Sequence, residues 1–369
     1  MTDILFVITS LNAGGAERVA VNLTTHWAEA GHETALVTIA NAEIDSFALH
    51  DSVKRAALGL TGESNNFIDS LWQNLRRVIA LRSVIKEHRP KVIVSFMTTN
   101  NVLTILANIG LGGRVVVSER THPPLVPASG FWNMMRARTY RFADLVVVVA
   151  KAGQEWILQN THARAVVVIP NWVVWPMVSA EPRVSPEAVL PEGFKVLLTV
   201  GGPCEVKGHD LLLEAFSLVC EDYPDWKLAV VGVDDPALQT LIGKFGLRDQ
   251  TVCTPRIGNI ADWYSKADIY VLSSRSEGFP NALLEAMASG CAPIAFDCDT
   301  GPRDILVHNN NGVLVNSADV FDLSKSLRMM MSDETKRVQF GQQASLVQET
   351  FSVKKIQAKW DKALELCVD

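Results

Sequence analysis

Short runs of aliphatic and β-branched residues alternate with segments of helical periodicity along the chain. In the first half, strands are expected at 4–9, 33–39, 92–96, 114–118, 145–149 and 165–169. The alternation restarts with a strand at 195–200 and a helix at 209–220. Strands that alternate with helices in this way are typical of parallel βαβ construction. The pattern therefore predicts an α/β fold.

A proline-rich interval divides the two halves. Residues 171–193 contain four prolines and have no clean periodicity, which is typical of a linker. We predict a first domain at 1–175, a linker at 176–193, a second domain at 194–350, and a C-terminal helix at 351–369 that packs back on the first domain. Two open parallel sheets joined in this way are expected as two facing Rossmann-like domains, with a ligand-binding cleft between them.

Composition places the chain among ordinary globular proteins. Hydrophobic residues make up 48% and charged residues 20% of the 369 residues. The first residues lack the basic start of a signal peptide, and no apolar run reaches the ~18–20 residues of a membrane helix. The six cysteines have irregular spacings without a CxxC pair, which fits a reducing compartment. The net charge is -6. We expect a cytoplasmic protein without a nucleic-acid partner.

Two adjacent glycines follow the first strand. Gly14 and Gly15 allow the backbone N–H groups at the start of the next helix to approach an anion. A tight strand–helix turn without a ligand explains them equally well. The segment is not GxGxxG, and no acidic residue is placed for a ribose after the second strand, which disfavours a dehydrogenase.

The most informative stretch carries two glutamates around a helix start. Glu277 precedes a Gly-Phe-Pro turn, and Glu285 lies little more than one turn inside the helix that begins near Asn281. The free N–H groups of a first helical turn attract phosphate, and carboxylates accept hydrogen bonds from hydroxyls. The alternative is a capping Glu277 and a surface Glu285, but Glu285 stands among apolar residues. A ligand with both hydroxyls and phosphates is expected here.

These residues resemble a known signature. The spacing E-x7-E followed by A-M-A-x-G is similar to the donor-binding motif of the retaining glycosyltransferases of family 4, which have the GT-B fold. Segments in the expected order extend the resemblance over nearly the whole chain: Gly14 to Glu17, Val200–Gly201, Lys207–Gly208, Ala267–Asp268, Thr300 to Asp304 and Asn311 to Val315.

The resemblance implies a nucleotide-sugar site in the second domain. Glu277 would contact the hydroxyls of the transferred sugar, Glu285 those of the ribose, and Lys207 the leaving diphosphate. The implied set of donor-binding residues is Gly14, Gly15, Gly201, Gly202, Lys207, Arg256, Glu277, Gly278, Phe279, Pro280, Asn281, Ala282 and Glu285. The implied reaction is front-face transfer with retention and without a cofactor. Asp297 and Asp299 are interpreted as turn residues, so no metal is predicted.

One position departs from the family pattern. The family usually has an arginine after the glycine of its phosphate motif, where this chain has Gly202. A guanidinium holds a diphosphate in bidentate fashion, which a lone lysine does not reproduce. Arg256, Arg275 and Arg303 are the candidates for the second positive charge, and the sequence leaves the choice among them open.

A second segment points to the acceptor. Ser118-Glu119-Arg120-Thr121-His122-Pro123 resembles a segment of family members that extend lipid-linked or polysaccharide acceptors. Many relatives place a histidine near this strand end, close to the reacting sugar. Either Arg120 occupies that position or His122 reaches it, and an ordinary loop histidine is an equal alternative. We expect Glu119 and Arg120 to face the acceptor of the first domain.

Substrates and partners follow from the same resemblance. We expect a UDP-linked hexose or N-acetylhexosamine as donor and a glycan linked to undecaprenyl pyrophosphate as acceptor, in cell-surface glycan synthesis. An amphipathic helix within 65–90 carries several arginines. It is expected as an ordinary core helix or, alternatively, as a peripheral contact with anionic lipid at the inner face of the membrane. Helpers in that contact would be Trp72, Arg136, Arg138 and Arg141.

Two other functions are compatible with the fold. A sugar-nucleotide epimerase would turn over the donor without an acceptor, and the E-x7-E signature argues against it. A non-catalytic sugar-nucleotide-binding partner is suggested by Gly202. Glu277, Glu285 and Lys207 favour an active transferase.

Overall fold

The computed structural model describes residues 2–12, 14–62, 67–125, 128–202 and 205–366. The chain forms two compact units. The first comprises Met1–Asn171 together with Ile356–Asp369, and the second comprises Trp172–Lys355. Each unit is an α/β domain built on one parallel sheet, as the alternating pattern predicts.

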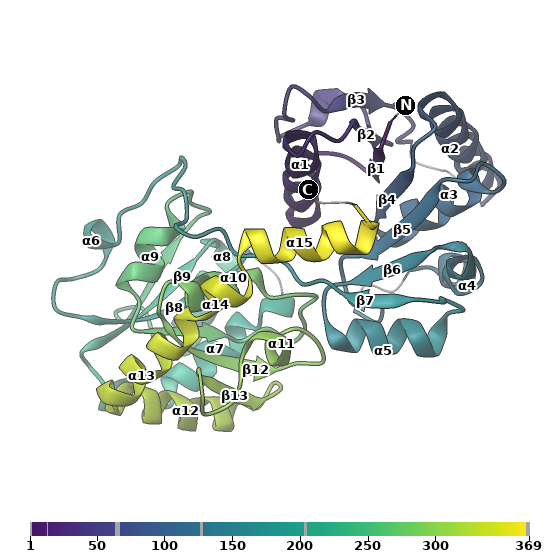
Figure 1. The fold of residues 1–369 in the computed structure, drawn as a ribbon. Coiled ribbons are helices and arrows are strands. Elements are labelled where there is room, and N and C mark those ends of the chain that lie inside the picture. Colours follow the sequence, from purple (N-terminus) through teal and green to yellow (C-terminus); the bar gives the residue numbers. More distant parts are fainter. Residues whose placement is uncertain (1, 13, 63–66, 126–127, 203–204, 367–369) are drawn as a thin grey trace. The chain divides into compact units, whose positions relative to one another are not determined.

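The first unit contains a seven-stranded parallel sheet of order β3-β2-β1-β4-β5-β6-β7 (Figure 1). Its strands are β1 (Ile4–Ile8), β2 (Thr34–Thr38), β3 (Lys54–Ala57), β4 (Val92–Phe96), β5 (Arg114–Glu119), β6 (Leu145–Val148) and β7 (Val166–Val168). Its helices are α1 (Gly15–Glu29), α2 (Phe67–His88), α3 (Thr98–Asn108), α4 (Gly130–Thr139), α5 (Lys151–Asn160) and most of α15 (Val353–Leu364), with short 3-10 turns η1 (Ala42–Ile44) and η2 (Tyr140–Phe142).

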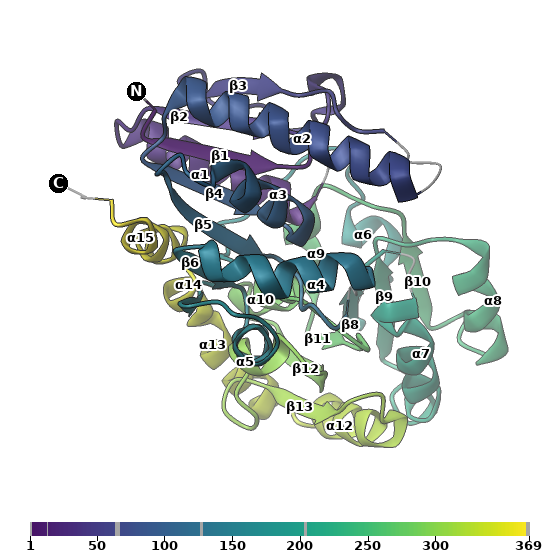
Figure 2. The same cartoon turned by 90° about the vertical axis from the view of Figure 1, so that its right-hand side faces the viewer.

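The central strands of this sheet, such as β1 and β4, are buried on both faces, which explains why they are mostly apolar runs rather than alternating ones. The face that carries Leu5 and Val7 packs against Leu81 and Ile85 of α2. In Figure 2, α2 and α3 lie over this sheet. On the other face, Phe6 lies 4.7 Å from Phe96 and 6.3 Å from Trp27 between ring centroids.

The second unit contains a six-stranded parallel sheet of order β10-β9-β8-β11-β12-β13. Its strands are β8 (Lys195–Val200), β9 (Trp226–Val231), β10 (Thr251–Thr254), β11 (Ile269–Leu272), β12 (Ala292–Asp297) and β13 (Val313–Asn316). Its helices are α6 (Pro186–Val189), α7 (His209–Ser217), α8 (Pro236–Lys244), α9 (Ile260–Lys266), α10 (Asn281–Ala288), α11 (Pro302–Ile305), α12 (Val320–Ser332), α13 (Glu334–Ser345) and α14 (Val347–Thr350), with 3-10 turns η3 (Glu205–Lys207) and η4 (Cys220–Asp222).

The segment 176–193, expected as a linker, is packed onto the second unit. The N–H of Gly258 donates to the carbonyl of Pro182 at 2.6 Å, and the indole of buried Trp263 donates to the carbonyl of Val184 at 2.8 Å. Asn259 exchanges two hydrogen bonds with the backbone of Val184. The prolines do not prevent this packing, because their carbonyls still accept hydrogen bonds. This segment is therefore part of the domain rather than a free spacer.

The last helix, α15, completes the first unit. The carboxylate of Asp361 accepts from the indole N–H of Trp27 at 2.9 Å and lies 3.0 Å from Nε2 of His26. The ring of Trp360 lies 5.8 Å from that of Phe96, and Arg114 donates to the carbonyl of Ala363 at 2.9 Å. Asp361 and Trp27 are buried, so these contacts belong to the core of the unit.

Candidate functional site

The predicted donor residues lie beyond the carboxyl ends of two neighbouring strands, β8 and β11. The chain turns from β8 towards β9 on one side, and from β11 towards β12 on the other. This is the topological switch point of the sheet, where the loops diverge and ligands bind in open α/β folds. The loop after β8 supplies Lys207, and the loop after β11 supplies Glu277.

Lys207 and Glu277 form an ion pair. Nζ of Lys207 lies 2.8 Å from Oε1 of Glu277, and the same oxygen accepts from the hydroxyl of Ser274 at 2.7 Å. The Glu277 side chain is 10% exposed and that of Lys207 is 32% exposed. Oε2 of Glu277 has no hydrogen-bond partner among the residues that the structure describes. One carboxylate oxygen is thus anchored while the other is available to a ligand hydroxyl.

The stem of Lys207 lies against Gly201. A Cβ atom at Gly201 would lie 3.2 Å from Cγ of Lys207, so the glycine leaves room for the lysine stem. Gly208, with φ of 63°, lies so close to the end of β11 that a Cβ atom there would be 2.0 Å from the carbonyl oxygen of Ser273. Only glycine adopts this backbone conformation at this distance without strain. The two glycines therefore bring the β8 and β11 loops together.

The Gly-Phe-Pro turn is held from two sides. The hydroxyl of Thr300 donates to the carbonyl of Glu277, and a Cβ atom at Gly301 would lie 2.6 Å from Cδ of Pro280. Phe279 is buried, with its ring 6.1 Å from that of Phe351. Phe279 and Pro280, expected at the donor, thus contribute packing that fixes the turn.

Helix α10 begins at Asn281, as the sequence indicates. The N–H of Asn281 donates to the carbonyl of Phe279, and that of Leu284 to the carbonyl of Pro280. The N–H groups of Ala282 and Leu283 have no acceptor within the described part of the chain. These donors and the positive end of the helix dipole favour an anionic ligand beside Glu277.

Glu285 lies one turn into α10, where the hydroxyl of Tyr264 donates to its Oε2 at 3.3 Å. Tyr264 and its neighbour Tyr270 are both buried. Burial, followed by the negative charge of Glu285, raises the pKa of Tyr264 well above its usual value. The tyrosine therefore keeps its proton and donates to the carboxylate.

The three arginines considered for the second charge have different surroundings. Arg275 is bound to Asp210 at 2.6 and 2.8 Å, which raises its pKa. Arg303 is paired with Asp297. Arg256 follows β10, is exposed, and forms no ion pair within the described residues. Of the three, Arg256 has the most freedom to meet an added anion.

The first unit places Gly14 and Gly15 at the start of α1, beyond the carboxyl end of β1. Gly14 is the N-terminal cap residue, in extended backbone, and the N–H of Arg18 donates to its carbonyl at 3.2 Å. The order β2-β1-β4-β5 puts this turn at the switch point of the first sheet. Residue 13, within the same turn, lies outside the described residues.

Glu119 does not face a ligand, contrary to the sequence-based expectation. Its side chain is 2% exposed, and its carboxylate accepts from Thr98 at 2.8 Å and from the hydroxyl of Tyr140. Arg136 lies 3.5 Å from the same carboxylate and is itself 1% exposed. A buried carboxylate needs such partners, because an unpaired charge is costly in the core. Arg136 is likewise a core residue rather than a lipid contact.

Arg120 is a largely buried cation with unused donors. Its guanidinium lies over the ring of Phe96, 4.8 Å from the centroid, and donates to the side chain of Asn171. Its Nε and Nη1 atoms are buried and have no partner within the described residues. Burial lowers its pKa to about 10, so it remains charged at neutral pH. His122 is also buried, at 8% exposed, and follows Arg120 in the same loop.

No group of His, Cys, Asp or Glu that could hold a metal ion occurs among the described residues. Asp297, part of the Asp-Cys-Asp sequence, is paired with Arg303. Burial raises the pKa of the Cys298 thiol to about 12, so it stays protonated. Within the described residues Asp299 forms no ion pair, although its charge, after that of Asp297, helps to raise the pKa of Arg303.

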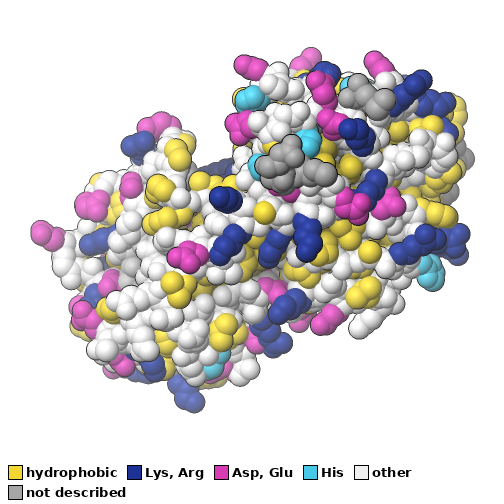
Figure 3. All heavy atoms as spheres, viewed as in Figure 1, with side chains coloured by type: hydrophobic (Ala, Val, Ile, Leu, Met, Phe, Trp, Pro, Cys, Tyr) yellow, Lys and Arg dark blue, Asp and Glu magenta, His cyan; other side chains and the backbone are white. Residues whose placement is uncertain are grey.

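Helix α2 exposes large hydrophobic side chains on one face. Leu71, Trp72, Leu75 and Ile79 are between 47% and 60% exposed. Arg77 and Arg82 donate to backbone carbonyls, whereas Arg76, Lys86 and Arg89 make no such contact within the described chain. Figure 3 shows basic and hydrophobic side chains next to one another at the edge where Figure 1 places α2. We call Leu71, Trp72, Leu75, Ile79 and these three cations the α2 face.

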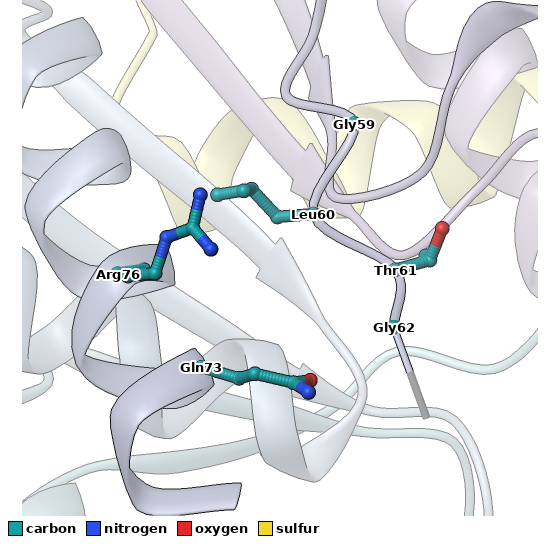
Figure 4. A pocket seen from close by; sticks show the side chains of 6 residues that line it. All are labelled: Gly59, Leu60, Thr61, Gly62, Gln73 and Arg76. Atoms are coloured by element: carbon teal, nitrogen blue, oxygen red, sulfur yellow. The ribbon is translucent and has the colours of Figure 1, made fainter. Parts of the chain in front are cut away.

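A small pocket adjoins the α2 face. Gln73 and Arg76 project from α2 towards the loop 59–62, and Figure 4 shows the Arg76 guanidinium beside Leu60. The space enclosed is about 170 Å³. Arg76 therefore lies next to the exposed hydrophobic residues of α2 and also lines this pocket.

Comparisons with known proteins identify the class. A family model described as "Glycosyl transferases group 1" matches residues 181–347, and one described as "Glycosyltransferase Family 4" matches residues 13–174. The two models together span most of the chain, which therefore combines a family 4 and a group 1 glycosyltransferase domain. Structural neighbours agree with the GT-B type of two Rossmann-like domains, so the predicted family and fold class are confirmed.

One relative covers the whole chain. The chain is 25% identical over 374 residues to the Campylobacter jejuni "GalNAc-alpha-(1->4)-GalNAc-alpha-(1->3)-diNAcBac-PP-undecaprenol alpha-1,4-N-acetyl-D-galactosaminyltransferase", with 99% of this chain and 98% of the relative covered. Among solved structures, sucrose-phosphate synthase from Thermosynechococcus elongatus matches with a TM-score of 0.82 at 17% identity, over 99% of this chain and 98% of the other. The Anabaena protein HepE in complex with UDP and glucose matches with a TM-score of 0.77 at 17% identity, over 100% of both chains.

Sequence reasoning did not identify several residues that shape this site. Ser274 and Tyr264 contact the two glutamates. Thr300 was noted only as part of a family segment, and its contact with the turn was not predicted. A serine directly after a strand carries a weak signal, because strand ends meet ligands in parallel sheets. Tyr264 has no local signal at all, since its contact with Glu285 spans 21 residues.

Proposed function

We propose that this glycosyltransferase moves a hexose or N-acetylhexosamine from a UDP-linked donor to a glycan linked to undecaprenyl pyrophosphate. It does so with retention of configuration and without a metal ion. The main support is that Lys207, Glu277 and the free N–H groups of α10 lie together at the switch point of the second sheet. A UDP complex of a protein with the same fold and an undecaprenol-linked substrate in the name of a full-length relative support the choice of substrates.

In the proposed reaction, charge develops on the leaving diphosphate. Lys207 and the N–H groups of Ala282 and Leu283 stabilise that charge, which is the main catalytic contribution in such transfers. Oε1 of Glu277 stays bound to Lys207 and Ser274, while Oε2 accepts a hydrogen bond from a hydroxyl of the transferred sugar. Glu285 accepts from the ribose hydroxyls. The bond from the sugar to the diphosphate breaks, the acceptor oxygen forms the new one, and its proton passes to a diphosphate oxygen.

Arg120 is proposed to bind the acceptor. A buried guanidinium with two unused donors favours an anionic partner, since leaving such donors unpaired is costly. The pyrophosphate of a lipid-linked acceptor has the matching charge. Of the two residues expected to face the acceptor, Arg120 alone is kept in the proposal, because Glu119 is buried among partners of its own. His122 stays a candidate for contact with the reacting sugar.

The function is tested by nucleotide release from a panel of UDP- and GDP-sugars in the presence of EDTA. The reaction is run with and without an acceptor sugar on undecaprenyl pyrophosphate, and Glu285→Ala serves as the control. Acceptor-dependent release that the control lacks, with an α-anomeric product by NMR from an α-linked donor, supports the proposal. Binding of a donor without release for any acceptor indicates a non-catalytic binder instead, and release without an acceptor indicates an epimerase or hydrolase.

The membrane contact that the acceptor requires is assigned to the α2 face. Its apolar stripe and the cations Arg76, Lys86 and Arg89 match a bilayer surface with anionic lipid. No helix among the described residues is long and apolar enough to cross a membrane. We propose that the protein works at the inner face of the cytoplasmic membrane through this face.

Replacing Trp72 and Leu75 together by alanine is expected to weaken binding to vesicles that contain anionic phospholipid. The loss is about 10- to 100-fold, because two large side chains no longer enter the interface. Vesicle flotation measures the bound fraction. Phe321→Ala is the matched control, since Phe321 is 77% exposed and lies on α12 of the other unit. Equal binding by the double variant and the wild type contradicts the assignment.

Gly202→Arg is expected to strengthen UDP binding about tenfold, because it adds a bidentate diphosphate ligand. Apart from the adjacent residues of the chain, no described heavy atom lies within 4 Å of a Cβ atom at Gly202. Gly202 is exposed, so an arginine side chain has room. Stability should change by less than about 0.5 kcal/mol, as at most surface positions. Calorimetric titration with UDP measures the effect, with Gly202→Ala as the control. Unchanged affinity in the arginine variant means that another cation, such as Arg256, already occupies that position.

A further inference from the structure

Two tyrosines lie against the helix that carries Glu285. Tyr264 comes from α9 and Tyr270 from β11, and their rings pack edge to face with centroids 6.0 Å apart. Their exposed fractions are 1% and 0%. The two residues thus have the same chemistry, the same degree of burial and direct mutual contact.

Their hydroxyl groups differ. The hydroxyl of Tyr264 donates to Oε2 of Glu285 at 3.3 Å. The hydroxyl of Tyr270 is buried and has no hydrogen-bond partner within the described residues. One tyrosine therefore contacts a carboxylate of the donor site, while the other only packs beside it.

We propose that Tyr264 is a positioning residue for Glu285. Its hydroxyl holds the carboxylate in the orientation that accepts from the ribose hydroxyls of the nucleotide. A glutamate side chain has several rotatable bonds, and fixing it before the ligand arrives lowers the entropy lost on binding. The inference rests on the proposed role of Glu285 at the ribose.

The test compares the binding of UDP with that of 2′-deoxy-UDP by isothermal titration calorimetry. Wild type should bind UDP more tightly, because Glu285 accepts from the 2′-hydroxyl group. Tyr264→Phe should weaken UDP binding about three- to tenfold and 2′-deoxy-UDP binding much less, so that the preference shrinks. Tyr270→Phe is the matched control and should keep the wild-type preference, since it removes a hydroxyl without a partner.

A second comparison separates positioning from packing. In a Glu285→Gln background, Tyr264→Phe should have a clearly smaller effect on UDP binding than in wild type, because the two residues act together. An unchanged preference in Tyr264→Phe, or equal losses in the two phenylalanine variants, overturns the inference and leaves the function untouched. A wild type that binds both nucleotides equally overturns the ribose role of Glu285 and this inference with it. Thermal unfolding of each variant verifies that the fold is intact.

Discussion

Glu277→Gln is expected to lower kcat about 100- to 1000-fold. Magnitudes of this order follow the loss of one preorganised charged group that acts on the transition state. Glutamine keeps the shape of the side chain and can still accept from Ser274 at Oε1. It removes the negative charge that fixes Lys207, and it replaces the second carboxylate oxygen by an amide nitrogen, which cannot accept from a sugar hydroxyl.

Initial rates of acceptor-dependent UDP release measure this effect. Glu205→Gln is the control, because Glu205 is an exposed acid in the Lys207 loop whose side chain forms no hydrogen bond or ion pair within the described residues. The control should retain the wild-type kcat. A Glu277→Gln enzyme with full kcat would show that neither charge nor acceptor capacity at this position assists transfer, and the site would have to be placed elsewhere.

The second large effect concerns stability. Asp361→Ala is expected to destabilise the first unit by about 3 kcal/mol. The substitution leaves the buried indole N–H of Trp27 without an acceptor and removes the partner of His26. It also leaves a cavity between α15 and the rest of the unit.

Unfolding in urea, followed by tryptophan fluorescence, measures this loss. The transition of the first unit should move to lower urea concentration, while a separate transition of the second unit should stay in place. Asp361→Asn should reduce the stability of the first unit less than Asp361→Ala, because the amide oxygen of asparagine still accepts from the indole N–H of Trp27. Lys362→Ala, at an exposed position on the same helix, should be neutral. Equal midpoints for Asp361→Ala and Lys362→Ala would mean that α15 contributes little to the unit.

Much of the fold could be predicted from sequence because both sheets are parallel and buried on both faces. Strands such as β4 and β6 are short runs rich in β-branched residues, which is a strong local signal. The segment 176–193 was interpreted as a linker because of its prolines, which are also a local signal. Its hydrogen bonds with Gly258 and Trp263 join residues more than 70 positions apart, and composition does not encode them.

The same distinction applies to the site. The start of α10 and the place of Glu277 just before it were predicted because helix starts are local features, whereas Lys207 was predicted from the resemblance to the family motif. Glu119 follows the same logic, at the end of β5, and yet its carboxylate is turned into the core. What decides its direction is the presence of Tyr140 and Arg136, which are 17 to 21 residues distant along the chain. A carboxylate at the end of a strand can point either towards a ligand or into the core, and its tertiary contacts determine which of the two occurs.

The position of α15 has a consequence for how the protein is made. A ribosome delivers the chain from its amino terminus, and domains generally begin to fold as they emerge. The first unit, however, obtains Asp361 and Trp360 only from the last helix of the chain, after the entire second unit has been synthesised. Until then the indole of Trp27 lacks the acceptor that Asp361 of α15 provides. The face of the sheet that carries Phe96 also lacks its contact with Trp360. Translation that stops before residue 356 would therefore release a chain with a complete second unit and a first unit that lacks most of α15.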